Sequence, residues 1–378
     1  MKINKILKCI IIILLSLFVT FILFLFCPKI YKIYERFNSP FKYNDILNSE
    51  LNVLKILSDK CFIVLHEGEI KEYFSDKNLF GKTLFSLKDY SITEEDIALS
   101  DTGILFKFQD DTYNYLKYQN FINGQILDIV STNKNNLINM YIEDDKIVYY
   151  LKDNNTVGVN FFNLKTNKNK LILELESTIN NKESNYLSQP NITDEYIIFS
   201  TIREGEDDKK TSKIYFFNSE NDEINLLNNK DDLIYKPILY KNKLLGLKEN
   251  IVNEIIPDEL NDLNSVEYYA NCIVVFNEES NSWINLFNNY DIIKKDENVF
   301  DINQKEGFLY WISSFTNKGY FYDLKNNKVE SLFTKKINKL RPGDYNFSIL
   351  DIQDNIILYK VDIFGENNSL KQYIYKFK

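Results

Sequence analysis

The sequence predicts an all-β fold, a β-propeller of four-stranded blades, and two observations predict it. Seven polar turns are each followed by a short run of apolar, β-branched and aromatic residues. These runs begin at Cys61, Ile104, Ile147, Tyr196, Leu244, Phe308 and Ile356. The steps between these positions are 43, 43, 49, 48, 64 and 48 residues, close to the length of one propeller blade. Helical periodicity is nearly absent from this part of the chain, which excludes helical repeats.

Each apolar run is followed by a second pair of strands that a polar turn joins. In the fourth unit, residues 213–218 and 223–227 are such a pair, with the turn at residues 219–222. Period-two alternation around Asn and Asp turns is typical of hairpins. A strand before each run, such as residues 137–142, completes a four-stranded unit. Seven units predict seven blades, with six and eight as the alternatives.

The seventh unit lacks its outermost strand, because the sequence stops after the strand-like residues 372–377. Residues 41–47 are the available donor for the missing strand. Pairing of these two segments would remove the exposed edges of the ring. We therefore expect residues 41–378 to form one propeller domain, closed by pairing of its N- and C-terminal strands. With only 11 Gly and 6 Pro in the chain, Asn and Asp must make most of its turns.

An apolar segment precedes the propeller and predicts one N-terminal transmembrane helix. Residues 9–27 carry no charge, and 19 residues of helix approach the ~30 Å thickness of a hydrocarbon core. No small residues offer a signal-peptidase site, and Phe26 precedes Cys27 where a lipobox requires a small residue. We expect a short basic tail at 1–8, a signal anchor at 9–27 and a stalk at 28–40.

Charge divides the chain into two parts. The formal net charge of -9 consists of +5 in residues 1–36 and -14 in residues 37–378. An acidic body without a basic stripe predicts no nucleic-acid binding. Basic residues flank the apolar segment almost equally, but a short basic tail ahead of such a segment is the usual form of an export anchor. The prediction is a single-pass protein of the cell membrane with an extracytoplasmic body. Its two body cysteines, Cys61 and Cys272, are expected to be free thiols.

The blades resemble those of the broad TolB-like group of bacterial extracytoplasmic propellers, in which an apolar strand, a loop and a strand such as residues 213–218 precede a polar turn. The resemblance covers roughly residues 45–378 and concerns the architecture. It implies binding of proteins or glycans, and it assigns no functional residue of this chain.

Loop lengths point to one face of the predicted ring. Loops between the second and third strands of a blade lie on the same face of the ring as the connectors between blades. We call this face the long-loop face, because it includes the longest segments. These segments are residues 176–190, 203–212, 248–268, 334–345 and 362–371. Within residues 248–268, the stretch 257–263 predicts a short acidic helix that begins at Pro257. Binding sites concentrate on the loops of rigid scaffolds, so this face is the predicted working surface.

Five residues are the candidates for partner binding: Arg203, Asp258, Glu259, Tyr310 and Trp311. The first three lie in long loops of the predicted working surface. The aromatic pair suits a carbohydrate or peptide surface, with packing between blades as the alternative.

Motifs for catalysis are scarce. His66 is the only histidine, so a catalytic triad requires it and a histidine-rich metal site is excluded. The acidic clusters lack the alternating spacing and turn Gly of a calcium loop. We therefore predict no catalytic, cofactor-binding or metal-ligating residue, and no cofactor.

Two classes of function are consistent with the sequence. The preferred one is a membrane-anchored scaffold that binds a protein or cell-envelope polymer through its long-loop face. The alternative is a propeller enzyme, a carboxylate-dependent glycan hydrolase or lyase. Several close carboxylates in the central channel would favour the enzyme, and an aromatic or neutral channel would favour the scaffold.

Overall fold

A computed structural model gives the fold of the chain. It describes residues 41–44, 51–132, 136–153, 155–176, 178–179, 183–204, 210–227, 233–256, 264–286, 299–305, 308–313, 318–323, 328–332, 345–353, 356–363 and 370–377. The expected tail, anchor and stalk at residues 1–40 lie outside this set. Within the described part of the chain, no helix has the length and apolar character needed to cross a membrane.

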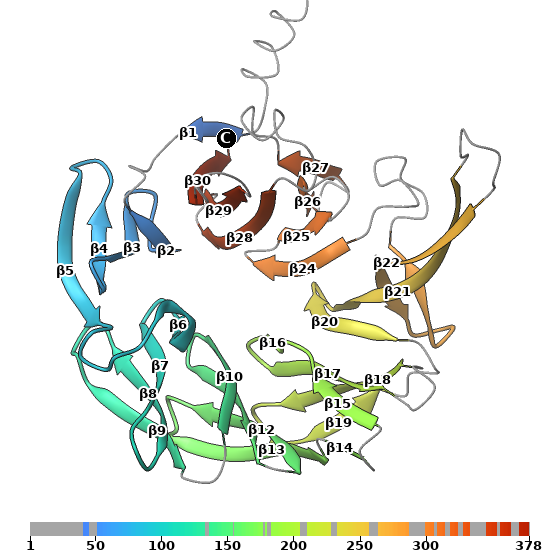
Figure 1. The fold of residues 1–378 in the computed structure, drawn as a ribbon, viewed down its shortest axis with the longest axis horizontal. Coiled ribbons are helices and arrows are strands. Elements are labelled where there is room, and N and C mark those ends of the chain that lie inside the picture. The colour runs from blue at the N-terminus through green and yellow to red at the C-terminus, as the bar shows by residue number, and fades with distance from the viewer. Residues whose placement is uncertain are drawn as a thin grey trace, which may run out of the picture.

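The described residues form seven antiparallel sheets, which are arranged in a ring around a common centre (Figure 1). Chain order and spatial order coincide within the first three sheets. The first sheet consists of β2 (Asn52–Ile56), β3 (Cys61–His66), β4 (Glu69–Phe74) and β5 (Leu79–Ser86). After the 3-10 turn Glu94–Asp96, the second consists of β6 (Ile97–Leu99), β7 (Gly103–Gln109), β8 (Asn114–Asn120) and β9 (Ile126–Thr132). The third consists of β10 (Asn136–Glu143), β11 (Lys146–Lys152), β12 (Thr156–Asn163) and β13 (Lys168–Glu176).

The remaining four sheets repeat this plan with one enlargement. The fourth has six strands, β14 (Thr178–Ile179), β15 (Glu183–Leu187), β16 (Asn191–Ile192), β17 (Tyr196–Glu204), β18 (Lys210–Asn218) and β19 (Ile224–Leu227). The fifth consists of β20 (Ile234–Tyr240), β21 (Lys243–Ile256), β22 (Asn264–Asn277) and β23 (Ser282–Asn285). The sixth consists of β24 (Val299–Lys305), β25 (Phe308–Ser313), β26 (Lys318–Asp323) and β27 (Lys328–Leu332). The seventh consists of β28 (Tyr345–Gln353), β29 (Ile356–Ile363), β30 (Leu370–Phe377) and, beyond β30, β1 (Phe41–Asn44).

The strand next to the innermost one (β3, β7, β11, β17, β21, β25 and β29) explains the seven apolar runs of the sequence. In β7, Ile104 and Phe106 pack against the first sheet, while Leu105 between them packs against the third. In β11, Val148 and Tyr150 pack against the fourth sheet. A strand that is buried on both faces needs apolar residues at successive positions, so it appears as a continuous run rather than an alternating one.

The first and seventh sheets meet through an apolar cluster and one buried carboxylate. Ile356 and Leu358 of β29 pack with Phe62 and Val64 of β3. Beside them, one carboxylate oxygen of Asp351 on β28 accepts a hydrogen bond from the backbone N–H of Ile56 on β2 at 2.8 Å. The other oxygen accepts the backbone N–H of the next residue in β28 at 3.0 Å. We call this contact the closing junction. It joins the two sheets that lie farthest apart in the sequence.

Asn and Asp make many of the turns, as the low glycine count predicts. Ten non-glycine residues of the described set have positive φ angles, and six of these are Asn or Asp. They are Asn78, Asp144, Asn167, Asp222, Asn242 and Asn281. These two residue types tolerate the left-handed conformation because their short polar side chains bond to the local backbone.

The long segments of the long-loop face differ from the loops expected there. Much of 248–268 is strand, because β21 and β22 are 14 residues each and pair from Leu245↔Val275 to Ile256↔Asn264. The expected acidic helix at 257–263 lies outside the described residues. In 176–190, β15 joins the fourth sheet by pairing with β17, so this connector is also partly strand. The prediction of loops was wrong at these places because a hairpin ladder continues wherever the backbone groups of two strands face each other, whatever the polarity of the side chains.

Replacing Asp351 with Ala tests the closing junction. The backbone N–H of Ile56 would lose a charged acceptor in a buried place, so we expect the free energy of unfolding to fall by about 1–3 kcal/mol. Urea unfolding of the full chain measures it. Asp76→Ala, in the exposed turn between β4 and β5, is the matched control and should change stability by less than about 0.5 kcal/mol. Equal effects of the two substitutions would contradict the role given to Asp351.

Candidate functional site

The innermost strands of the ring enclose a cavity of about 560 Å³ that we call the central channel. Its lining residues come from the first, second, third, fourth, sixth and seventh sheets. Residues 189–190, which join β15 to β16 within the fourth sheet, and Glu94, which lies between the first and the second sheets, also contribute. The volume falls in the range of small-molecule sites, so the channel is the first place to examine for a function.

A repeated β-bulge shapes the wall of this channel. In the first, third and seventh sheets the register of the innermost strand shifts at Leu54, Ile138 and Leu350. A bulge turns a side chain out of the regular alternation. Leu54 and Leu350 line the channel, and Ile138 is 37% exposed. The wall therefore presents an aliphatic side chain at the equivalent place in the first and seventh sheets.

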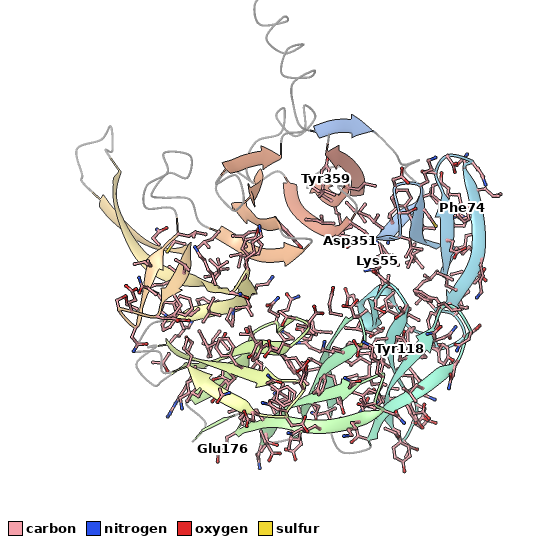
Figure 2. All side chains as sticks on the ribbon, turned by 180° about the vertical axis from the view of Figure 1, so that it is seen from behind. Lys55, Phe74, Tyr118, Glu176, Asp351 and Tyr359 are labelled. Atoms are coloured by element: carbon pink, nitrogen blue, oxygen red, sulfur yellow. The ribbon has the colours of Figure 1, made fainter. Side chains whose placement is uncertain are left out.

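Each of these bulges is followed by a polar residue, and two of those residues bind the next sheet. Lys55 and Asp351 occupy this place in the first and seventh sheets, and both lie at the inner side of the ring (Figure 2). The Lys55 ammonium is 2.9 Å from a carboxylate oxygen of Asp101 in the second sheet. Asp351 binds the backbone of the first sheet, as described above. The polar residues of the wall thus link one sheet to the next.

Other polar groups of the channel are engaged in the same way. The side-chain oxygen of Asn191 on β16 accepts the backbone N–H of Leu239 on β20 at 3.0 Å. The Glu94 carboxylate accepts the side-chain N–H of Asn52 at 2.7 Å. Burial raises the pKa of the Tyr141 phenol, which keeps it neutral at physiological pH. The described wall therefore combines aliphatic, phenolic and amide groups with one paired lysine, Lys55, and three carboxylates, Glu94, Glu143 and Asp351.

The structure places His66 away from the central channel. His66 lies at the end of β3 and stacks on Phe80 of β5, with ring centroids 4.5 Å apart, and it is not among the residues that line the channel. No group of three or more His, Cys, Asp or Glu side chains in the described part of the chain could hold a metal ion. Cys61 and Cys272 are free thiols, and burial together with the Glu72 carboxylate raises the pKa of Cys61.

The structure separates the five predicted binding residues. Tyr310 on β25 is 8% exposed and lines the central channel. Arg203 is exposed near the end of β17, opposite Thr211 of β18. The backbone of Trp311 pairs with Ile302 and Tyr320, while Asp258 and Glu259 lie outside the described residues. Arg203 and Tyr310 belong to the fourth and sixth sheets and form no common site.

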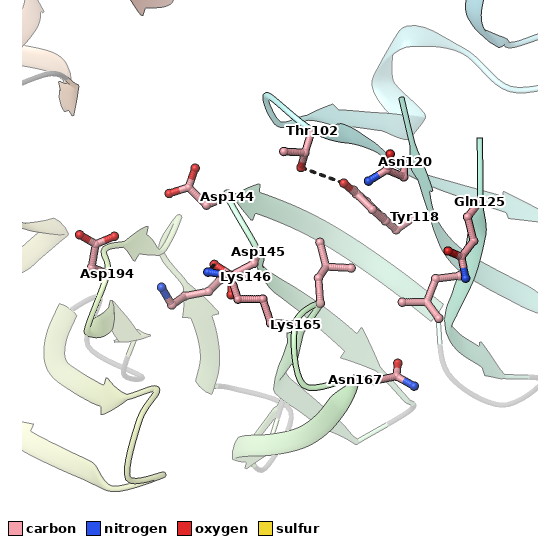
Figure 3. Close-up of a pocket in the computed structure, with 12 residues that line it drawn as sticks. Thr102, Tyr118, Asn120, Gln125, Asp144, Asp145, Lys146, Lys165, Asn167 and Asp194 are labelled. Carbon is pink, nitrogen blue, oxygen red and sulfur yellow. Dashed lines mark hydrogen bonds and ion pairs between the residues drawn. The ribbon is translucent and has the colours of Figure 1, made fainter. Parts of the chain in front are cut away.

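A second cavity, of about 880 Å³, opens on the opposite face from the long loops. Its residues come from the turns between first and second strands and between third and fourth strands in the second, third and fourth sheets (Figure 3). We call this cavity the turn groove. It is lined by Thr102, Tyr118, Asn120, Gln125, Leu127, Asp144, Asp145, Lys146, Leu164, Lys165, Asn167 and Asp194.

Two internal contacts organise the turn groove. The hydroxyl groups of Thr102 and Tyr118 are 2.9 Å apart and join the turn of β6 and β7 to β8. The Lys165 ammonium is 3.2 Å from a carboxylate oxygen of Asp145, which joins two turns of the third sheet. The sequence shows these residues only as polar turns. The meeting of turns from three successive blades depends on how the blades pack, which no sequence motif encodes.

Seven sheets whose innermost strands surround a channel define the fold as a β-propeller. The propeller domain of the Trilobed protease from Pyrococcus furiosus has the same fold, with a TM-score of 0.54, 10% identity, and coverage of 87% of this chain and 93% of that one. That domain has an open velcro topology, whereas here β1 pairs with β30 in one sheet.

Two further propellers are similar at lower scores. TolB from Acinetobacter baumannii has a TM-score of 0.40 and 10% identity, over 84% of this chain and 77% of that one. An oligogalacturonate lyase from Vibrio parahaemolyticus has a TM-score of 0.45 and 11% identity, over 72% and 74%. The expected resemblance to TolB-like propellers is thus confirmed as a resemblance of fold. No protein-family model matches the chain, and no curated protein matches its sequence.

The ion pair between Lys55 and Asp101 gives an asymmetric prediction. Asp101→Ala should lower the free energy of unfolding by about 1–3 kcal/mol, because it leaves the ammonium of Lys55, whose side chain is only 9% exposed, without a counter-charge. Lys55→Met should cost less than about 1 kcal/mol, because Asp101 is 52% exposed and returns to water. Urea unfolding of both single variants and the double variant measures the difference. A larger loss for Lys55→Met would contradict this account of the channel wall.

Proposed function

We propose that this chain is a membrane-anchored, extracytoplasmic propeller of seven blades that binds a protein or cell-envelope polymer through its long-loop face. The observation that carries the proposal is the long hairpin of the fifth sheet. β20 pairs with β21 only as far as Lys248, and β23 pairs with β22 only from Val274 onward. Among the described residues, 249–256 and 264–271 therefore pair only with each other, and we call them the hairpin arm.

The arm extends past the strands that flank it in the described part of the fifth sheet. Strands of 14 residues extend about 46 Å, roughly twice the span of the five- to eight-residue strands of the first sheet. Figure 1 shows β21 and β22 running out past β20. A two-stranded hairpin is at best marginally stable in water by itself. A partner that covers the arm, or that adds a strand to one of its free edges, would stabilise it, and this favours a protein partner.

The other parts of the proposal rest on the sequence and on the packing of the ring. The uncharged residues 9–27 behind a basic tail support a retained N-terminal membrane helix with the body outside the cytoplasm. Six apolar clusters, each shared by two neighbouring sheets, include the cluster between the first and the seventh and support a count of seven blades.

A scaffold is preferred to a glycan hydrolase or lyase because two of the three carboxylates that line the channel, Glu94 and Asp351 but not Glu143, make contacts that support the ring. Asp351 is bound to two backbone N–H groups, and Glu94 is bound to Asn52. A glycosidase needs a pair of carboxylates free to meet the substrate. These two side chains hold the ring together instead.

Shortening the arm tests the binding surface. Because Glu249 and Asn271 face each other in the ladder, residues 250–270 can be replaced by Asn-Gly, a two-residue hairpin turn. We expect this variant to unfold at an unchanged temperature and to lose crosslinking to the partner in intact cells. Glu278→Gln combined with Glu279→Gln, in the turn of the same sheet on the opposite face, is the control and should keep the crosslink. A retained crosslink in the shortened variant would remove the arm from the binding surface.

Protease accessibility tests the location of the body. An extracytoplasmic body should be cleaved when protease is added to intact cells from which any outer barrier has been removed, while a cytoplasmic marker protein stays whole. Clipping should start in exposed turns rather than in the ring strands, which are paired and buried. Protection in intact cells followed by digestion after lysis would place the body in the cytoplasm and refute this part of the proposal.

A further inference from the structure

The ring protects the outer edge of each of its seven sheets against the addition of another strand. Among the described residues, the outermost strands of four sheets are only four or five residues long, namely β1, β19, β23 and β27. In the other three sheets the outermost strand, β5, β9 or β13, is longer, and bulges break its register with the neighbouring strand. Short strands and bulges both hinder further pairing at an edge. The ladder of each sheet therefore ends at these strands.

The hairpin arm has neither form of protection. Its two segments of eight residues, 249–256 and 264–271, pair in a continuous register without a bulge. Neither segment contains Pro or Lys, the residues that most often block an edge. No other strand in the described part of the chain pairs with them. Alternate residues of an edge strand direct their backbone N–H and C=O groups away from the ladder, so both edges can accept a further strand.

Charge of a single sign distinguishes the arm from a neutral edge. Residues 249–271 contain six acidic residues and no basic residue. Three of the acids, Glu249, Glu254 and Glu267, belong to the two paired segments. A strand added to either edge would lie about 4.8 Å away, which is within the screening length of about 8 Å at physiological salt. The acids therefore oppose an acidic strand at this place and favour a basic one.

The open edges and the charge together select one kind of occupant. A second copy of the chain would bring another acidic arm against the first, and an anionic lipid or polymer would be repelled in the same way. A neutral glycan has no regular row of peptide groups with which to continue a backbone ladder. An extended polypeptide with basic residues satisfies the backbone groups and the charge at once.

We propose that the hairpin arm binds an extended basic segment of a partner protein, which adds a strand to one of the edges of the arm. Backbone hydrogen bonds provide the affinity, and the acidic residues of the arm select the partner. Each edge of eight residues holds a segment of about the same length. This inference rests on the function proposed above and specifies the chemistry of the partner.

Three fluorescent peptides of equal length test the proposal by anisotropy with the full chain in detergent micelles. The basic peptide is Thr-Lys-Val-Lys-Val-Lys-Val-Thr. The acidic peptide has Glu in place of Lys, and the proline peptide keeps the lysines but has Pro in place of two of the Val residues. The basic peptide should bind at least about tenfold more tightly than the acidic one. It should also bind at least about fivefold more tightly than the proline peptide, which has the same charge but cannot continue a ladder. Raising the salt concentration from about 0.05 M to about 0.5 M should weaken the basic peptide, because screening reduces its attraction to the arm.

Variants of the chain locate the binding on the arm. Replacing residues 250–270 by Asn-Gly should abolish binding of the basic peptide. Combining Glu249→Gln, Glu254→Gln and Glu267→Gln should reduce the preference for the basic over the acidic peptide at least about threefold, while the preference over the proline peptide remains. Glu278→Gln with Glu279→Gln, which changes exposed acids in the turn between β22 and β23, is the control and should leave all three affinities unchanged.

The comparison of the three peptides on the parent chain does not depend on the folding of any variant. Equal binding of the basic and acidic peptides, equal binding of the basic and proline peptides, or binding retained after removal of the arm would each overturn the proposal. A dimer of the full chain that is lost when the arm is shortened would show that a second copy occupies the edge, and would overturn it as well. If the shortened variant loses its crosslink in intact cells but the basic peptide does not bind the parent chain, the arm remains the binding surface and only the basic partner is refuted. A crosslink that the shortened variant retains contradicts the proposed function itself, and the inference with it.

Discussion

The ring depends on one packing constraint, namely that the second strand of every sheet must be covered on both faces. A sheet that lay alone would expose side chains such as Phe62 or Phe106, and each such group contributes about 1.5–3 kcal/mol when it is removed from water. When seven similar sheets pack side by side in a ring, each sheet covers the faces of its two neighbours, and no other element is needed to bury these side chains. The same constraint then requires the first sheet to meet the seventh. Ile356 and Leu358 supply the apolar surface for that contact. Several buried residues take part, so apolar packing outweighs the single carboxylate of Asp351, whose hydrogen bonds fix the register of the contact.

The innermost strands show how the same ring deals with polar residues. A bulge in these strands turns an aliphatic residue towards the channel and places the next residue, Lys55 or Asp351, at the junction between sheets. Such residues would be costly inside the apolar layers, but at the junction they find partners on the neighbouring sheet. Asn191 makes the corresponding contact between the fourth and fifth sheets. The polar groups of Lys55, Asp351 and Asn191 in the channel wall thus serve as contacts between neighbouring sheets.

The sequence predicted those features that depend on local pattern. Runs beginning at residues such as Ile104 and Ile147 became the second strands, and Asn and Asp made the turns, because burial on both faces and left-handed backbone each impose a residue type at a position. The sequence did not predict the extent of β21 and β22, since backbone hydrogen bonds continue a ladder through polar residues such as Asn250 and Asn253 without a signal in the side chains. Nor did it predict the turn groove. Asp144 and Asp194 are 50 positions apart, and they share a cavity only because two blades pack side by side.

One feature of the molecule goes beyond what the described ring requires. The hairpin arm extends past the described strands that flank it in the fifth sheet. Natural sequences that break local rules generally do so where a function compensates for the loss. The long strands suit a partner that extends a sheet, and the packed ring supplies the rigid base from which such an arm can be presented.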